Sequence, residues 1–214
     1  ENYWDTDAEG HSLPYLDEII AKPKREDSVR LTALRTGQVQ LIDDMAQADV
    51  ARFMKEHGAK YNTWLRHSAG NYIVFNWRRG VFQDKRMRTA AEHATDREAL
   101  HQAVYYGQGE ILDQCYPHGD PWYLEGIRAL EYAPDRAKAL LKEARAVGTT
   151  VKIIAASATA LARETVLVLQ ASWEAVGLKA TIDLLDTVPF QAAAREGDFD
   201  ARLGRDAFVR LLYR

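Results

Sequence analysis

The sequence predicts an α/β fold with βαβ units, and two observations support that prediction. Segments with the two-residue period of a strand alternate along the chain with segments that have the period of a helix. In the last third, a strand pattern, a long helix pattern and a second strand pattern follow one another with short connections. This order is the arrangement of a parallel βαβ unit, which is typical of α/β proteins.

The first 80 residues contain two helix patterns between short strand patterns. The first helix begins at Asp27 or Ser28, either of which can act as an N-cap, and Gly37 ends it. The second helix runs from Asp49 to Glu56, before Gly58. Strands are predicted where β-forming or alternating residues occur, at residues 16–21, 39–41, 61–66 and 71–77.

Helical spacing dominates after Gly80. Asp84 and Asp96 each precede a series of apolar residues at three- and four-residue intervals, so both are predicted N-caps of helices. Residues 113–134 are rich in Pro, Gly and aromatic residues, which predicts a long surface loop. Its aromatic side chains either contact a ligand or a neighbouring lobe, or hold the loop against the body of the protein.

The last third gives the clearest pattern. A helix is predicted at residues 137–144, and the βαβ unit follows as a strand at 151–155, a helix at 162–176 and a strand at 178–184. Crossover connections of this kind are almost always right-handed. Ligands of such sheets approach the carboxyl ends of the strands, which places the expected rim at residues 155–158 and 185–187.

The composition describes a soluble globular protein of one or two domains. The chain has 214 residues, of which 47% are hydrophobic, and a mean hydropathy of -0.38. The net charge of -3 gives no reason to expect binding to nucleic acid. The chain begins without an initiator Met or a signal-peptide pattern, so we expect both ends to lie inside a longer protein.

No motif for catalysis, nucleotide binding or metal binding is found in the sequence. HExxH, GxSxG, P-loop and GxGxxG patterns are absent, and no two of the six histidines have the spacing of a helical metal pair. Cys115, His118 and Asp120 are close in sequence, but Pro117 and Gly119 favour an ordinary turn there. We therefore expect a binding protein without catalytic residues, cofactor or metal.

One segment resembles a known family. Residues 82–90 read Phe-Gln-Asp-Lys-Arg-Met-Arg-Thr-Ala, and residues 94–100 read Ala-Thr-Asp-Arg-Glu-Ala-Leu. Together they resemble the F-x-D-x-R-x-R-x-A and A-x-D-R-x-x-L signature of the family 5 extracellular solute-binding proteins, the receptors of dipeptide, oligopeptide and nickel ABC importers. Four further segments resemble family motifs in the same order, namely residues 2–4, 30–39, 72–76 and 133–141, and residues 197–200 resemble the late G-x-F-D.

The resemblance implies part of a two-lobed, type II periplasmic-binding-protein-like fold. Residues 1–78 would be the second part of lobe I, and residues 79–214 would be most of lobe II, truncated. The implied function is that of the periplasmic or other extracytoplasmic solute-binding component of a bacterial ABC importer, for peptides. Its implied partners are a peptide or small-molecule solute and the importer's membrane subunits, and we expect a monomer that binds no nucleic acid. A hydrolytic α/β enzyme and a solute-sensing regulatory module are the alternatives.

The resemblance also suggests which residues contact the solute. Tyr72 would line the cleft, with Asn76 at the end of the same strand. Arg202 and Arg205 would bind the carboxylate of a peptide, and Asp206 would bind its amino group. The Trp that often precedes the amine-binding Asp in peptide receptors is missing before Asp206.

Overall fold

The structure is a computed structural model that describes residues 3–24, 26–43, 45–58, 60–61, 69–114, 116–157 and 160–207. The side chains of residues 51, 69, 70 and 205–207 also lie outside the description. The chain divides into two compact units, Glu1–Val50 and Ala51–Arg214. This division falls before residue 78, and the assignment of lobes in a longer parent protein stays a prediction.

The first unit contains the predicted helix α1 (Asp27–Arg35). Its N-cap is Glu26 rather than Asp27 or Ser28, and the Glu26 side chain makes no capping hydrogen bond. Gly37 follows the helix with a φ of 73°, a conformation that glycine adopts without strain.

Two predicted strands of the first unit are wrong. Residues 16–21 and 39–41 are irregular, and Ile19 and Ile20 are 81% and 65% exposed. The N–H of Val39 instead donates to the carbonyl of Ala33, so Val39 is bonded to the last turn of α1. β-forming residues alone do not make a strand, because a strand also needs a partner for its backbone groups.

Helix α2 (Gln47–His57) crosses the boundary between the units, begins two residues before the predicted start and ends immediately before Gly58. Residues 62–68 lie outside the described residues, and with them most of the strand predicted at 61–66. The remaining elements are β1 (Ala69–Phe75), the 3-10 turn η1 (Val81–Gln83), α3 (Lys85–Ala94), α4 (Arg97–Tyr105), α5 (Pro134–Glu143), β2 (Thr150–Ala156), α6 (Ala160–Ala175), β3 (Lys179–Leu185), α7 (Thr187–Glu196) and β4 (Ala201–Ala207).

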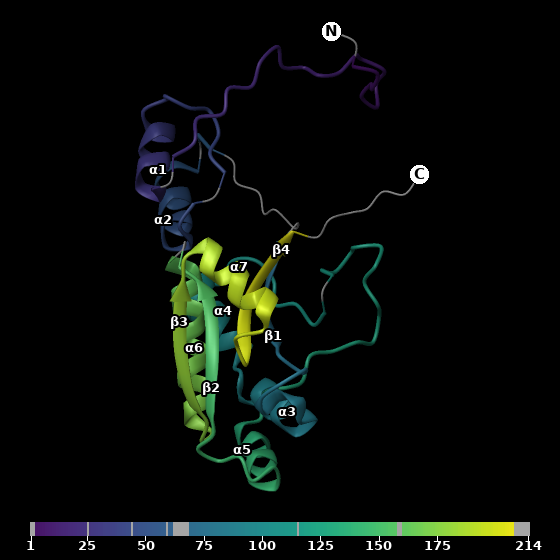
Figure 1. Ribbon diagram of the computed structural model, residues 1–214. Helices are drawn as coiled ribbons and strands as arrows, with labels where there is room; N and C mark the ends of the chain where they lie inside the picture. The colour runs from purple at the N-terminus through teal and green to yellow at the C-terminus, as the bar shows by residue number, and fades with distance from the viewer. Residues whose placement is uncertain are drawn as a thin grey trace. The chain divides into compact units, whose positions relative to one another are not determined.

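The four strands form one sheet in the order β1-β4-β2-β3 (Figure 1). β2 and β3 are neighbouring parallel strands, and α6 connects them in sequence, which confirms the predicted βαβ unit. β4 is parallel to β2, and β1 is antiparallel to β4. β1 and β4 are more than a hundred residues apart in sequence, so their side chains meet only in the folded chain.

The two predicted caps are confirmed. Asp84 Oδ1 accepts the N–H of Arg86 at 2.8 Å at the start of α3, and Asp96 Oδ1 accepts the N–H of Ala99 at 2.8 Å at the start of α4. The loop predicted at 113–134 is also confirmed, since the residues described between α4 and α5 contain no helix or strand. The Tyr123 ring contacts that of His118 within that loop, at 4.5 Å between the ring centroids, whereas Trp122 is 65% exposed.

One face of the sheet carries the core. Phe82 is fully buried there, with its ring centroid 4.5 Å from that of Phe75 and 6.0 Å from that of Trp173. The indole N–H of Trp173 donates to Thr95 Oγ1 at 3.1 Å. Figure 1 shows α6 behind the sheet and α7 in front of it. Further core residues are Met87, Ala90, Leu141, Val151, Ile153, Ala155, Val166, Leu169, Ala201 and Leu203.

The sequence patterns did not predict α7 or β4. The sequence of α7 has no clear apolar stripe, and none of the residues of this helix is fully buried. β4 reads Ala-Arg-Leu-Gly-Arg-Asp-Ala, which contains no β-branched residue. Pairing with strands on both sides makes it a strand. Among the described residues, no helix is both long enough and apolar enough to span a membrane.

Candidate functional site

The candidate site lies on the face of β1 and β4 that points away from the core. Successive side chains of a strand alternate between the two faces of a sheet. Ala201 and Leu203 belong to the core, so Arg202 and Gly204 lie on the other face. The register pairs Tyr72 with Gly204 and Val74 with Arg202. We call the surface formed by Tyr72, Val74, Arg202 and Gly204 the outer face.

Arg202 is the charged residue of the outer face. Its side chain is half-buried between Val74 on β1 and Ile154 on β2, and Ile154 is fully buried. In the described part of the chain, no residue forms a hydrogen bond or an ion pair with the Arg202 guanidinium. A half-buried cation without a partner is costly, and a carboxylate on a ligand is the group that an Arg binds best.

Tyr72 lies next to Arg202 on this face, and it is also half-buried. Tyr72 is paired directly with Gly204, so it is a diagonal neighbour of Arg202 across the two strands. The structure therefore brings together two of the predicted ligand-binding residues, Tyr72 and Arg202. An apolar ring beside a cation suits a ligand that carries a carboxylate next to a less polar group.

Asn76 has a different environment from Tyr72. It is 7% exposed, and its Nδ2 donates to the carbonyls of Gly197 and Phe199, each at 3.0 Å. Its Oδ1 accepts the N–H of Arg78 at 3.2 Å. These contacts give Asn76 a structural role at the point where β4 begins, and its predicted contact with a solute stays untested.

The backbones of Arg205 and Asp206 lie in β4, opposite Asn71 and Gly70. Their side chains lie outside the described part of the structure, so both ligand contacts stay predictions. Gly204 was not singled out from the sequence. A glycine inside a strand is nevertheless a recognisable sign that another group approaches the backbone closely.

The predicted rim is formed at the carboxyl ends of β2 and β3. Ser157 Oγ donates to Asp186 Oδ1 at 2.7 Å, and the Ser157 N–H donates to the carbonyl of Leu185 at 2.8 Å. Helix α7 begins at the next residue, Thr187. The two segments of the predicted rim, residues 155–158 and 185–187, are therefore in contact through Ser157. Residue 158 lies outside the described residues.

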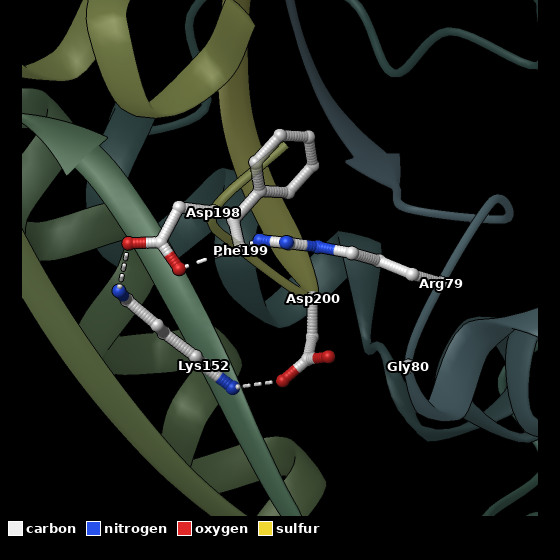
Figure 2. Close-up of a pocket in the computed structure, with 6 residues that line it drawn as sticks. All are labelled: Arg79, Gly80, Lys152, Asp198, Phe199 and Asp200. Atoms are coloured by element: carbon white, nitrogen blue, oxygen red, sulfur yellow. Dashed lines mark hydrogen bonds and ion pairs between the residues drawn. The ribbon is translucent and has the colours of Figure 1, made fainter. Parts of the chain in front are cut away.

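A hollow lies at the other end of the sheet from the rim, where β2 and β4 begin. Figure 2 shows its lining residues, which are Arg79, Gly80, Lys152, Asp198, Phe199 and Asp200. Lys152 Nζ lies 3.0 Å from Asp198 Oδ2 and 3.5 Å from Asp183 Oδ2, and Arg79 Nη2 lies 3.4 Å from Asp198 Oδ1.

The charged groups that line this hollow are bonded to one another. Asp200 Oδ2 accepts the N–H of Lys152 at 2.8 Å, and the N–H of Asp200 donates to the Lys152 carbonyl at 3.0 Å. Ligands of open α/β sheets bind at the carboxyl ends of the strands, and this hollow is at the amino ends. We therefore interpret the hollow as structural: it joins the start of β4 to β2.

The ion pair in the hollow predicts a dependence of stability on pH. The hydrogen bond and charge of Lys152 hold the pKa of Asp198 below its ordinary value of 3.8. A carboxylate whose pKa is lowered by folding stabilises the protein above the unfolded pKa and loses that effect as pH falls through the folded pKa. Asp198→Asn should therefore lower the thermal midpoint near neutral pH, and the difference from the unsubstituted protein should shrink as pH falls below about 4 and disappear below the lowered pKa of Asp198.

Thermal melts of both proteins between pH 2 and pH 7 would measure this difference. Asp135→Asn is the matched control, because Asp135 is 97% exposed and pairs only with Lys138 among the contacts described for it. The control should give the same midpoint as the unsubstituted protein throughout. A difference for Asp198→Asn that is constant over the whole pH range would contradict the prediction.

Two groups contain the residue types that ligate metals. His118 Nε2 bonds the Tyr123 hydroxyl, and Asp120 Oδ1 accepts the N–H of Trp122, while Cys115 lies outside the described residues. Asp7, Glu9 and His11 have ligand atoms within 4.8 Å of one another. The Asp7 carboxylate already accepts the N–H groups of Glu9 and His11. We assign no metal to either group.

The chain is similar to known proteins over most of its length. The family model described as bacterial extracellular solute-binding proteins, family 5 middle, matches residues 1–207. The dipeptide-binding protein of Escherichia coli (strain K12) is 26% identical over 203 residues, which are 92% of this chain and 37% of that protein. Di/tripeptide-binding protein 1 of Pseudomonas aeruginosa (strain UCBPP-PA14) is 27% identical over 208 residues, 95% of this chain and 38% of that protein.

Among solved structures, the periplasmic binding protein DppA of Helicobacter pylori, an ABC-transporter-associated protein in complex with the peptide STSA, is similar with a TM-score of 0.76. It is 21% identical, and the match covers 96% of this chain and 38% of that one. This likeness confirms the predicted fold class. The chain spans less than two fifths of the length of these relatives.

Proposed function

Because the chain belongs to the family 5 bacterial extracellular solute-binding proteins, we propose that its parent protein is the extracytoplasmic solute-binding component of an ABC importer and that its solute is a peptide. The family membership confirms the resemblance found at residues 82–100. The peptide class is supported by relatives named for binding dipeptides and tripeptides. The comparisons give no support to a hydrolytic enzyme or a regulatory module.

The environment of Arg202 is the observation that supports the proposed peptide site on the outer face. A peptide has a terminal carboxylate, and the outer face offers a half-buried guanidinium with no partner among the described residues. Tyr72 beside it would contact the last residues of the peptide. In this proposal the parent protein works as a monomer, delivers the peptide to the importer's membrane subunits, carries out no catalysis and binds no nucleic acid.

The class of solute can be tested by thermal-shift screening of the full-length protein. Dipeptides and tripeptides, nickel chelates and sugars would be added separately, and a ligand that binds the native state raises the midpoint. We expect peptides to raise it in a concentration-dependent manner. A shift with another class and none with peptides would show that the peptide assignment is wrong.

The role of Arg202 gives a prediction about affinity. Hydrogen bonds to charged groups contribute about 1.5–3 kcal/mol, so Arg202→Gln should weaken peptide binding by roughly 10- to 100-fold. Arg163→Gln is the control, because Arg163 is exposed on α6. Isothermal titration calorimetry with a peptide and with its carboxyl-amidated form measures the affinity of each variant.

We expect the amidated peptide to bind weakly to the unsubstituted protein and to be insensitive to Arg202→Gln. Equal loss of affinity for both peptide forms would instead show that Arg202 does not bind the terminal carboxylate. Arg163→Gln should leave the affinity unchanged for both forms.

A further inference from the structure

Gly204 has an unusually close neighbour on the outer face. A Cβ atom built on Gly204 would lie 2.5 Å from Tyr72 Cε2, 2.7 Å from Cζ and 3.0 Å from the hydroxyl oxygen. Real Cβ atoms do not approach other atoms at 2.5 Å. The Tyr72 ring therefore occupies the space that any side chain at position 204 would need.

The backbone of β4 does not explain this glycine. Gly204 is absent from the residues with positive φ, so its backbone is in a conformation that other residues adopt. Glycine weakens the interior of a strand, because it has the largest loss of backbone freedom and no side chain to pack. Gly204 is nevertheless buried, and the aromatic ring opposite it on β1 provides the cover. An aromatic side chain that covers a glycine across two strands is a known means of stabilising a sheet.

The position of the ring has a consequence for the outer face. The hydroxyl end of the ring lies over Gly204 on β4, two residues from Arg202, and Tyr72 keeps part of its surface exposed. A larger residue at position 204 would displace the ring from its present position over β4. The absence of a side chain at 204 thus fixes where the ring lies relative to Arg202.

We propose that Gly204 is a positioning residue of the solute site: it lets the hydroxyl end of the Tyr72 ring lie over β4 at position 204, so that the ring forms a platform beside Arg202. This inference rests on the proposed function. The platform suits a planar group that lies next to a carboxylate, such as the last peptide unit or an aromatic side chain on the last residue of a peptide.

A double-mutant cycle in the full-length protein tests the proposal. The variants are Gly204→Ala, Tyr72→Ala and the combination, with Tyr72→Phe as the background that retains a ring. Calorimetric titrations would use the dipeptides Ala-Ala and Ala-Phe. Gly204→Ala should lower affinity by roughly two- to tenfold in the unsubstituted and Tyr72→Phe backgrounds, and should have no effect in the Tyr72→Ala background.

The two dipeptides distinguish the two planar groups. An equal loss for Ala-Ala and Ala-Phe indicates that the peptide unit rests on the ring, and a loss confined to Ala-Phe indicates the aromatic side chain. If Gly204→Ala weakens binding equally in the unsubstituted and Tyr72→Ala backgrounds, the glycine does not act through the ring and the proposal is overturned.

A crystal structure of the Gly204→Ala protein tests the same proposal without any solute. The Tyr72 ring should be displaced from β4. A ring in the same position as in the unsubstituted protein would overturn the proposal. This readout is independent of peptide binding, so failure of the peptide assignment and failure of the Gly204 assignment are distinguishable.

Discussion

Phe82→Ala is expected to lower the free energy of unfolding of the unit that contains the sheet by about 3–5 kcal/mol. Phe82 is fully buried, and its ring contacts those of Phe75 and Trp173. These three rings join η1, β1 and α6. The substitution leaves a cavity at their junction that rigid neighbours cannot fill, which adds to the lost transfer free energy.

Urea unfolding of the full-length protein, followed by tryptophan fluorescence and by circular dichroism, measures the loss. Val188→Ala on α7 is the control, because Val188 is 77% exposed and should change stability by less than about 0.5 kcal/mol. A loss below about 1 kcal/mol for Phe82→Ala would mean that the aromatic cluster does not hold the core together.

Asn76→Ala is expected to have the second large effect, a loss of about 2–4 kcal/mol. The substitution removes both donors to the carbonyls of Gly197 and Phe199 and the acceptor for the N–H of Arg78. The Phe199 carbonyl bond is buried, so that oxygen would lose its partner without gaining water. Asn76→Asp should be no better than Asn76→Ala, because a carboxylate oxygen would face two carbonyl oxygens.

Gln83→Ala is the matched control for Asn76. Gln83 also donates a side-chain amide to a backbone carbonyl, that of Arg78 at 2.8 Å, but it does so at an exposed position. We expect a loss of less than about 1 kcal/mol for the control. The same variants separate the two roles of Asn76: lower peptide affinity with unchanged stability would favour the ligand contact predicted from the sequence over the structural role.

Local patterns predicted the elements whose causes are local. Asp84 and Asp96 cap helices through bonds to N–H groups two and three residues ahead, so their role could be predicted from spacing alone. The βαβ unit was predictable for a similar reason, since both its strands and its helix have apolar patterns of their own. The strands expected at 16–21 and 39–41 had the residue types but not the partner strand.

The candidate site depends on contacts that are distant in sequence. Tyr72 and Arg202 share a face only because β1 pairs with β4 in one register, and a shift of one residue would place them on opposite faces. Asn76 is bonded to residues 121 and 123 positions away, so no local pattern distinguishes a structural amide from a ligand contact there. The close approach of Tyr72 to Gly204 is of the same kind.

The most direct measurement is a crystal structure of the full-length protein with a bound peptide. We expect the carboxylate of the peptide to be hydrogen-bonded to the Arg202 guanidinium and the Tyr72 ring to be within contact distance of the peptide, about 4 Å. A peptide that contacts neither residue, or that occupies the hollow lined by Lys152 and Asp198, would contradict the assignment of the outer face as the solute site.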